Sequence, residues 1–141
     1  MLLSRTAEYA LRAMTFLAMQ PAGKLAGARA ISEAEHIPMP FLWKILHTLA
    51  RQRLIRSFKG IHGGYELARP SSEITLHSVV LATDGTDFTG HCVLGLPNCR
   101  EENACPLHHT WKRIRGQMTD MLEQTTLADL ARVARKRKGK K

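Results

Sequence analysis

The 141-residue sequence has few of the features that mark membrane and secreted proteins. No apolar run reaches the roughly 18 residues that a membrane-spanning helix needs. Charged side chains occur within the stretch from Met1 to Glu8, whereas a secretory signal needs an unbroken apolar segment. We therefore expect a cytoplasmic protein with no membrane association. Three cysteines are an odd number, and a reducing compartment disfavours disulfides, so a disulfide framework is not expected.

The sequence also lacks the short motifs of several enzyme classes. It contains no H-x-E with P-C-x-x-C, no G-x-S-x-G and no glycine-rich phosphate-binding loop. A ferredoxin normally supplies four cysteines to a cluster, and this chain has three. A small metal-dependent enzyme or electron carrier is therefore the weakest of the functions considered, and we expect a protein that is not an enzyme.

Positive charge is abundant, and it is unevenly distributed. The formal net charge is +9, and residues 1–70 carry ten Lys and Arg against four Asp and Glu, whereas residues 71–131 carry four against eight. A basic N-terminal half indicates a polyanionic partner, because phosphate contacts supply affinity that does not depend on sequence. Residues 132–141 carry seven Lys and Arg and no acid, and we expect them to form a disordered basic tail.

Hydrophobic spacing predicts three helices in the first part of the chain. Apolar residues recur every three or four positions from about Arg5 to Met19, and Ser4 is a suitable N-cap. A short helix is expected over residues 28–35, and another over 40–51, where Pro40 suits the first turn because its missing N–H costs nothing there. Two short helices joined by a tight turn predict a helix-turn-helix.

Two β-like runs follow directly, at residues 54–59 and 64–69. The intervening Gly60-Ile61-His62-Gly63 contains the glycines that a hairpin turn requires. A hairpin after a helix-turn-helix predicts the wing of a winged helix. A further helix over 76–83, capped by Thr75, completes a predicted DNA-binding domain of residues 1–84. The predicted fold class is therefore mostly α with a small β-hairpin wing.

Residues 85–105 lack periodicity and are predicted to form a cysteine-rich loop. The spacing is Cys92-x6-Cys99-x5-Cys105, with His108 three residues further on. Three thiolates and one imidazole could bind a [2Fe–2S] or [4Fe–4S] cluster, or tetrahedral zinc, and spacing alone does not choose between them. The alternative without a metal is that the three cysteines are unrelated buried side chains. The clustering of all three within fourteen residues of one polar loop argues against this alternative.

A long helix is predicted to begin at Pro106, with Cys105 as its N-cap. The helix dipole would favour a thiolate at Cys105, and His108 would share a helical face with it. Apolar residues in this helix follow the 4-3-4-3 spacing of helices that pack together, which favours a dimer seam over intramolecular packing. We expect residues 106–131 to form this dimerisation helix and a short C-terminal helix. The seam residues are Leu107, Trp111, Ile114, Met118 and Met121.

These segments together resemble the Rrf-type winged-helix transcriptional regulators, some of which are iron–sulfur proteins. The resemblance covers nearly the whole chain to about Leu130, and the Gly-Gly-Tyr wing combined with the cysteine loop is specific. It departs from the pattern at Trp43, where the cluster regulator of the family carries a glutamate that influences base choice. The carrying segments are 9–12, 37–46, 54–60, 63–70, 74–76 and 84–85.

The resemblance implies a homodimer whose crossed C-terminal helices place a cluster near the DNA-binding unit. It implies Cys92, Cys99 and Cys105 as cluster ligands, with His108 as the fourth. In some members an acidic residue near the start of the first helix ligates the partner subunit's cluster, so Glu8 is the alternative fourth ligand. Glu8 could instead form a surface ion pair with Arg12, four residues away.

The predicted function is a homodimeric regulator whose binding to a palindromic DNA operator is controlled by an iron–sulfur cluster, with [2Fe–2S] favoured over [4Fe–4S]. The alternative is the same DNA binder with zinc or free thiols as a redox sensor. The helix over 40–51 would enter the major groove, and the wing would contact phosphates or the minor groove. The residues expected to contact DNA are Met39, Pro40, Trp43, Lys44, His47, Arg56, Ser57, Lys59 and His62.

Overall fold

The computed structural model describes residues 3–85, 92–96 and 100–138 of the chain. In these ranges the protein is mostly helical with one two-stranded antiparallel hairpin, which confirms the predicted fold class. Helix α2 (Ala28–Glu35) has the predicted bounds, and α1 (Arg5–Ala18) and α3 (Met39–Arg51) each differ from prediction by one residue at one end. The other elements are β1 (Ile55–Phe58), β2 (Gly64–Leu67), α4 (Leu76–Asp84), α6 (His108–Gln124), α7 (Leu127–Lys138) and two short 3-10 turns (Ser71–Glu73 and Glu101–Asn103).

The start of α1 is fixed by Ser4, as the sequence predicted. Its hydroxyl oxygen accepts a hydrogen bond from the backbone N–H of Ala7 at 3.0 Å, which satisfies one of the donors that a helix start leaves open. The same hydroxyl donates to the carboxylate of Asp84, the last residue of α4, at 2.7 Å. The beginning of α1 is therefore joined to the end of α4. The cysteine segment, residues 85–105, begins directly after this helix.

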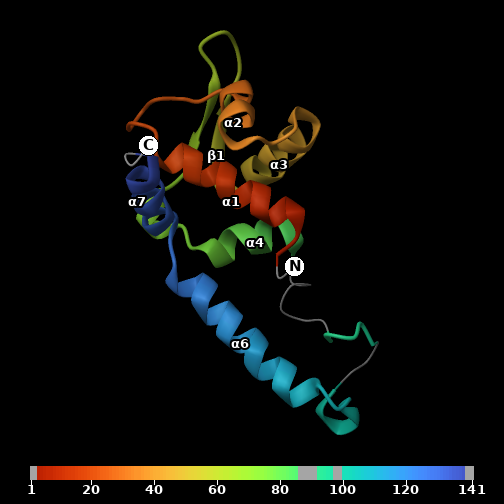
Figure 1. Ribbon diagram of the computed structural model, residues 1–141. Coiled ribbons are helices and arrows are strands. Elements are labelled where there is room, and N and C mark those ends of the chain that lie inside the picture. The colour runs from red at the N-terminus through yellow and green to blue at the C-terminus, as the bar shows by residue number, and fades with distance from the viewer. Residues whose placement is uncertain (1–2, 86–91, 97–99, 139–141) are drawn as a thin grey trace.

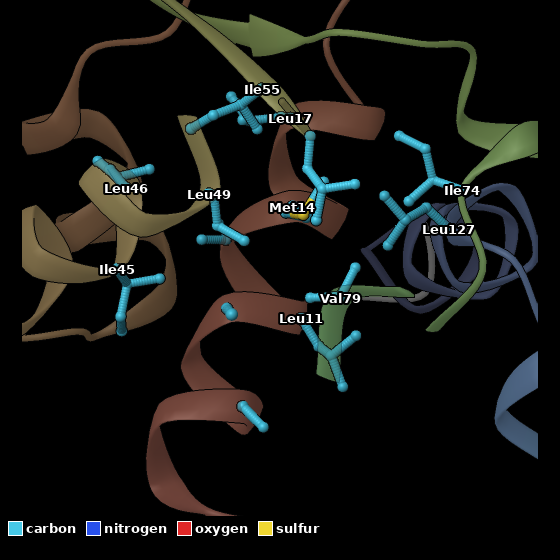
Figure 2. Packing of buried hydrophobic residues seen from close by; sticks show 14 of the residues in the cluster. Leu11, Met14, Leu17, Ile45, Leu46, Leu49, Ile55, Ile74, Val79 and Leu127 are labelled. Carbon is cyan, nitrogen blue, oxygen red and sulfur yellow. The ribbon is translucent and has the colours of Figure 1, made fainter. Parts of the chain in front are cut away.

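The hydrophobic core surrounds α1, which lies between α3 on one side and α4 and α7 on the other (Figures 1 and 2). Met14 on α1 is fully buried among side chains from these elements. Burying such a side chain contributes about 1.5–3 kcal/mol relative to leaving it exposed. The core therefore joins α1, near the start of the chain, to residues from the middle of the chain and from α7 near its end. These residues include Leu46, Leu49, Ile74, Val79 and Leu127.

The wing is a hairpin in which Ile55 pairs with Leu67 and Phe58 pairs with Gly64. Its β2 edge is also paired, because Tyr65 and Ala26 exchange two backbone hydrogen bonds, of 2.8 and 3.0 Å. This contact explains the glycine at position 64: its φ is +152°, and a Cβ there would lie 2.9 Å from the Ala26 carbonyl oxygen. The wing is thus held to the loop before α2 through Tyr65, which is one strand pair away from the turn.

Helix α6 projects away from this body as a long arm (Figure 1). Leu122, near its C-terminal end, is its one buried residue. There the chain re-enters the body, because the backbone of Leu76 donates to Thr125 at 2.9 Å and that of Leu127 donates to Ile74 at 3.0 Å. The arm is therefore attached to the body at the α6–α7 junction. None of the helices in the described ranges is long and apolar enough to cross a membrane.

The start of α6 differs from the prediction. The helix begins at His108 rather than Pro106, and its N-cap is Leu107 rather than Cys105. The N–H of His108 donates to the Cys105 carbonyl at 3.1 Å, so residues 105–108 form a turn that precedes the helix. Proline suits the second position of a turn as well as the first turn of a helix, because both need its fixed φ. The sequence pattern did not separate these two uses.

The C-terminal tail differs as well. Residues 132–138 do not form a disordered tail but continue α7 through Lys138, and residues 139–141 lie outside the described part of the chain. The helix is tied to α1, because the Arg135 guanidinium donates to the Ala18 carbonyl at 3.1 Å and the Lys138 ammonium lies 5.9 Å from the centre of the Phe16 ring. Cations at the C-terminal end of a helix are also favoured by its dipole.

Candidate nucleic-acid interface and cysteine site

Helix α3 presents one apolar face to the core and a different face to solvent. Leu42, Ile45, Leu46 and Leu49 are buried, which fixes the rotation of the helix about its axis. The opposite face then carries Trp43, which is 61% exposed, together with exposed Lys44 and His47. Pro40 is exposed and Met39 is partly buried in the first turn. These five predicted DNA-contacting residues therefore lie at or beside the accessible face of α3.

A groove separates α3 from the wing. It encloses about 280 Å³ and is lined by Trp43 and His47 from α3, Ser57 from β1 and Tyr65 from β2, together with Leu46 and Ala50. The fold therefore brings three of the predicted contact residues, from two elements, to one concave surface. The surface joins a helix face to a two-stranded hairpin, and both kinds of element are of a size that can enter a groove of duplex DNA.

The other predicted residues lie along the wing. Arg56, Ser57, Lys59 and His62 are all exposed. Arg56 pairs across the hairpin with Glu66, with 3.4 Å between Nε and Oε1. The Arg56 guanidinium is therefore shared with a carboxylate, whereas Lys59 precedes the turn and His62 lies within it. Lys44 on α3 and Lys59 on the wing each add an exposed positive charge to this surface.

Three exposed apolar residues on this surface were not predicted as contacts. Ile61 at the wing tip is 98% exposed, Phe41 on α3 is 58% exposed and Phe58 on β1 is 46% exposed. The ring of Phe41 packs against that of Tyr9 on α1, with centroids 6.5 Å apart. A signal for Ile61 was present in the sequence, since it is a β-branched apolar residue inside a glycine-bounded turn.

The predicted ion pair between Glu8 and Arg12 is not formed. The Arg12 guanidinium donates instead to the backbone carbonyl of Glu35, the last residue of α2, and lies 5.5 Å from the centre of the Tyr9 ring. A carbonyl at the end of a helix is a favourable acceptor, because it lacks an intrahelical partner. Glu8 is partly exposed in the first turn of α1 and does not serve as the counterion of Arg12.

Cys92 and Cys105 are both partly buried, and no disulfide joins them. The Cys92 sulfur accepts a hydrogen bond from the backbone N–H of Leu94 at 3.4 Å, and the Gly95 N–H donates to the Cys92 carbonyl at 2.9 Å. A backbone N–H that points at sulfur stabilises the thiolate, which is the form that binds metals. Cys92 therefore lies in a turn suited to metal ligation.

The segment before Cys105 is held against the start of α6. The Glu101 carboxylate and the Lys112 ammonium are 2.5 Å apart, and the hydrogen bond from Lys112 holds the pKa of Glu101 below its ordinary value. His108 lies one turn after Cys105 and is partly buried, with its Nε2 atom fully buried and its ring 5.2 Å from that of His109 in an edge-to-face arrangement. Cys105 and His108 are thus held in one turn at the N-terminal end of the arm.

The donor set fits an iron–sulfur cluster or zinc by its chemistry, since thiolates and an imidazole bind both. The structure brings Cys105 and His108 together, but among the described residues no group of three candidate ligands converges. Cys99 lies outside the described residues. Glu8 lies on α1 within the body, whereas Cys105 and His108 lie at the end of α6 far from the body (Figure 1).

Comparison with known proteins places the whole described fold in one group. A family model described as "Rrf2: Iron-dependent Transcriptional regulator" matches residues 3–133. A Mycobacterium tuberculosis protein named as an HTH-type transcriptional regulator is 41% identical over 93% of this chain and 81% of that protein. The HTH-type transcriptional regulator NsrR of Shouchella clausii is 32% identical over 92% and 88% of the two chains. The structure of CymR, the global cysteine regulator of B. subtilis, superposes with a TM-score of 0.79 over 93% of this chain and 96% of that one, at 24% identity.

Proposed function

The chain belongs to the Rrf2 family of DNA-binding transcriptional regulators, and we propose that it is a homodimer whose operator binding is controlled by an iron–sulfur cluster. The observation that carries the proposal is the combination of two features in one chain. An exposed reading surface on α3 and the wing is linked to a cysteine segment that ends in the Cys105–His108 turn. A regulator of this kind would act in the cytoplasm, and it is not an enzyme.

In this proposal α3 enters the major groove of duplex DNA and the wing lies on the backbone or in the minor groove. Trp43, Lys44 and His47 would be nearest the base edges, with Met39 and Pro40 at the start of the helix. Arg56, Ser57, Lys59 and His62 would contact phosphates or the minor groove. The groove shared by Trp43, His47 and Ser57 supports this arrangement, because one surface then contacts both grooves.

The proposed dimer forms through α6. Leu107, Ile114 and Met121 are 44%, 41% and 56% exposed, and they lie on the predicted seam with partly buried Trp111 and Met118. A monomer would leave this apolar stripe on a projecting helix in water, which favours association along the stripe. Two such subunits would present two copies of α3 to a palindromic site.

The proposed cluster ligands are Cys92, Cys99 and Cys105, with His108 as the fourth. When bound, a [2Fe–2S] cluster would supply a one-electron redox centre. The Cys92 turn and the Cys105–His108 turn would hold the two ends of the ligand set, and the Glu101–Lys112 pair would anchor the second turn to α6. The description of the family as iron-dependent supports iron over zinc.

Glu8 is the competing fourth ligand, and the structure limits how it could act. It is on the body, away from the N-terminal end of α6, so Glu8 would reach the cluster of the partner subunit rather than its own. Its proposed competitor, His108, is already in the turn that holds Cys105. The Arg12 contact with Glu35 removes the ion pair that would otherwise have occupied Glu8.

Contacts that could carry a change at the cluster to α3 pass through α1. The cysteine segment begins just after Asp84, whose carboxylate is bonded to the Ser4 cap of α1. One turn along α1, the Tyr9 ring packs on Phe41 of α3. A shift in the segment would then move the first turns of α1 and α3 together and change the population of binding-competent dimers.

Anaerobic purification tests the proposal directly. We expect a coloured protein that contains iron and sulfide in equal amounts. It should bind selected members of a randomised duplex pool, and this binding should change when the cluster is removed. Cys92→Ala, Cys99→Ala and Cys105→Ala should each lose the visible absorbance but keep the helical circular dichroism. If no duplex is preferred with or without the cluster, the regulator proposal fails.

The fourth ligand is decided by paired variants. His108→Ala should bleach the cluster or shift its spectrum, whereas Glu8→Ala should leave the spectrum nearly unchanged. His109→Ala, which removes the adjacent imidazole, is the matched control for His108. The opposite result, with Glu8→Ala bleaching the cluster and His108→Ala silent, would assign the site to Glu8 of the second subunit.

A second candidate is the same DNA-binding regulator using zinc or bare thiols as the redox sensor. It is favoured by the partly buried thiols of Cys92 and Cys105 and by the likeness of the fold to CymR, which is titled a cysteine regulator. Colourless protein with stoichiometric zinc, or DNA binding that changes on thiol oxidation in iron-free protein, would favour this candidate.

A further inference from the structure

The wing ends in an isoleucine that contacts almost nothing in the protein. Ile61 is 98% exposed, more than any other large hydrophobic residue described. A single exposed apolar residue on a protein surface is common and needs no explanation by itself. The backbone that presents Ile61 and the charges around it are what give this residue a role.

The turn that carries Ile61 has a conformation that requires glycine at two positions. The N–H of Gly63 donates to the carbonyl of Gly60 at 3.0 Å, which closes a four-residue turn with Ile61 and His62 at its two corners. Gly60 has a φ of +100°, which side chains rarely allow. A Cβ at Gly63 would lie 2.0 Å from the Phe58 carbonyl oxygen. Both glycines are therefore required, and they hold the isoleucine outward at the tip.

The side chains beside Ile61 are polar, and one of them is a cation. Lys59 and His62 are exposed on either side of Ile61, and the Ala26–Tyr65 pair joins β2 to the body two residues after Gly63. An apolar side chain between a lysine cation and an imidazole on a projecting hairpin matches the chemistry of the DNA minor groove. Cations are drawn to the negative potential of a narrow A·T groove, and apolar side chains press against its sugars and base edges.

We propose that Ile61 is an apolar wedge that enters the minor groove beneath the wing tip and discriminates against G·C base pairs there. Guanine places its 2-amino group in the minor groove, where A·T pairs have none. An isoleucine at that point would clash with the amino group and shield its N–H from water without accepting a hydrogen bond, which is unfavourable. Deformable pyrimidine–purine steps such as TA would accept the wedge most readily.

This inference rests on the proposed placement of the wing in the minor groove. It assigns sequence preference to base pairs flanking those read by α3. Because Ile61 makes no packing contact that its loss would disturb, Ile61→Ala should fold and melt as the wild type does. The variant can therefore be tested for DNA recognition without a change in stability.

The experiment uses the full-length dimer and a duplex selected from a randomised pool. Each A·T pair of the selected site is replaced in turn by G·C and by inosine·C, since inosine presents the major-groove edge of guanine but lacks the 2-amino group. At the position beneath the wing, G·C should weaken wild-type binding by about tenfold. Inosine·C should restore most of that loss.

Three variants complete the test. Ile61→Ala should reduce the tenfold discrimination to less than about twofold, and Ile61→Leu, which keeps an apolar side chain of similar size, should retain it. Val133→Ala, which shortens another exposed apolar residue far along the chain on α7, should behave as the wild type. Discrimination that survives in Ile61→Ala, or inosine that behaves as guanine at every position, would overturn the wedge while leaving DNA binding intact. Absence of duplex binding by every protein would instead overturn the proposed function as well.

Discussion

The winged-helix body and the cysteine-bearing arm differ in how much of their structure each can hold by itself. The body buries side chains from α1, α3, α4 and α7 around Met14. The cysteine-bearing arm includes α6 and the described residues of the cysteine segment that precedes it. Among these residues only Leu122 is buried, and Val93, Leu94 and Ile114 are between 41% and 56% exposed. Folding of the body is therefore driven by its own core, whereas the arm buries too little apolar surface to be stabilised in the same way.

The largest expected effect is in the body. Leu46→Ala should lower the free energy of unfolding by about 2–5 kcal/mol, because it opens a cavity at a fully buried site. Leu94→Ala deletes the same atoms from a 56% exposed side chain of the arm and should change that free energy by less than about 0.5 kcal/mol. Urea denaturation of cluster-free protein measures both. Equal losses would mean that the cysteine segment belongs to the cooperative core.

The next effect concerns the arm and its partner. Ile114→Glu places a charge in the proposed seam and should raise the dimer dissociation constant by about a hundredfold, measured by sedimentation, with the helical circular dichroism retained. Gly116→Glu adds the same charge at an exposed position of α6 where a Cβ meets no atom within 4 Å, so it should leave the dimer intact. A dimer unaffected by Ile114→Glu would place the interface elsewhere.

The smallest effect lies at the junction of the two regions. The backbone N–H of Thr126 donates to the Asp129 carboxylate at 2.9 Å, and this bond is the main reason that the pKa of Asp129 is below its ordinary value. A depressed aspartate pKa stabilises the fold above the ordinary pKa, and this stabilisation is lost as the pH falls through the depressed value. Asp129→Asn should therefore lower Tm at neutral pH by about a few degrees or less.

The pH series is the check on that prediction. The Tm difference between Asp129→Asn and wild type should shrink as the pH is lowered into the acidic range where the carboxylate is protonated. Asp120→Asn removes the same charge from an exposed position of α6 and serves as the control. A Tm difference that stays constant down to the lowest pH at which the protein is folded would contradict the assigned role of Asp129.

The body could be predicted from sequence because its signals are local. Apolar periodicity, the Ser4 cap and the glycine-bounded hairpin each act over a few residues, and α1, α2, α3 and the wing lie where these signals indicated. The missed features depend on distant partners. Arg12 binds the Glu35 carbonyl instead of Glu8, and α7 extends because Arg135 and Lys138 contact α1. The spacing of residues in the sequence does not predict contacts between such distant parts of the chain.

The candidate site divides in the same way. The exposed face of α3 was predictable, because burying Leu42 and Leu46 forces Trp43 and Lys44 outward. The start of α6 was not, because proline is equally suited to a turn and to a first helical position. The ligand roles of Cys92, Cys99, Cys105, His108 and Glu8 stay predictions, because Cys99 lies outside the described residues and no three candidate ligands converge among the described ones.

The path of the chain has a consequence for synthesis on the ribosome. The polypeptide leaves the body after Asp84 and returns at Leu122, and Leu127 and Ala131 of α7 fill core positions against α1. The winged-helix body therefore cannot complete its packing until the cysteine segment, α6 and α7 have been translated. A nascent or truncated chain that stops within the arm would lack the α7 side chains that complete the core of the body. Each molecule with a fully packed DNA-binding unit therefore already carries the segment that is proposed to regulate it.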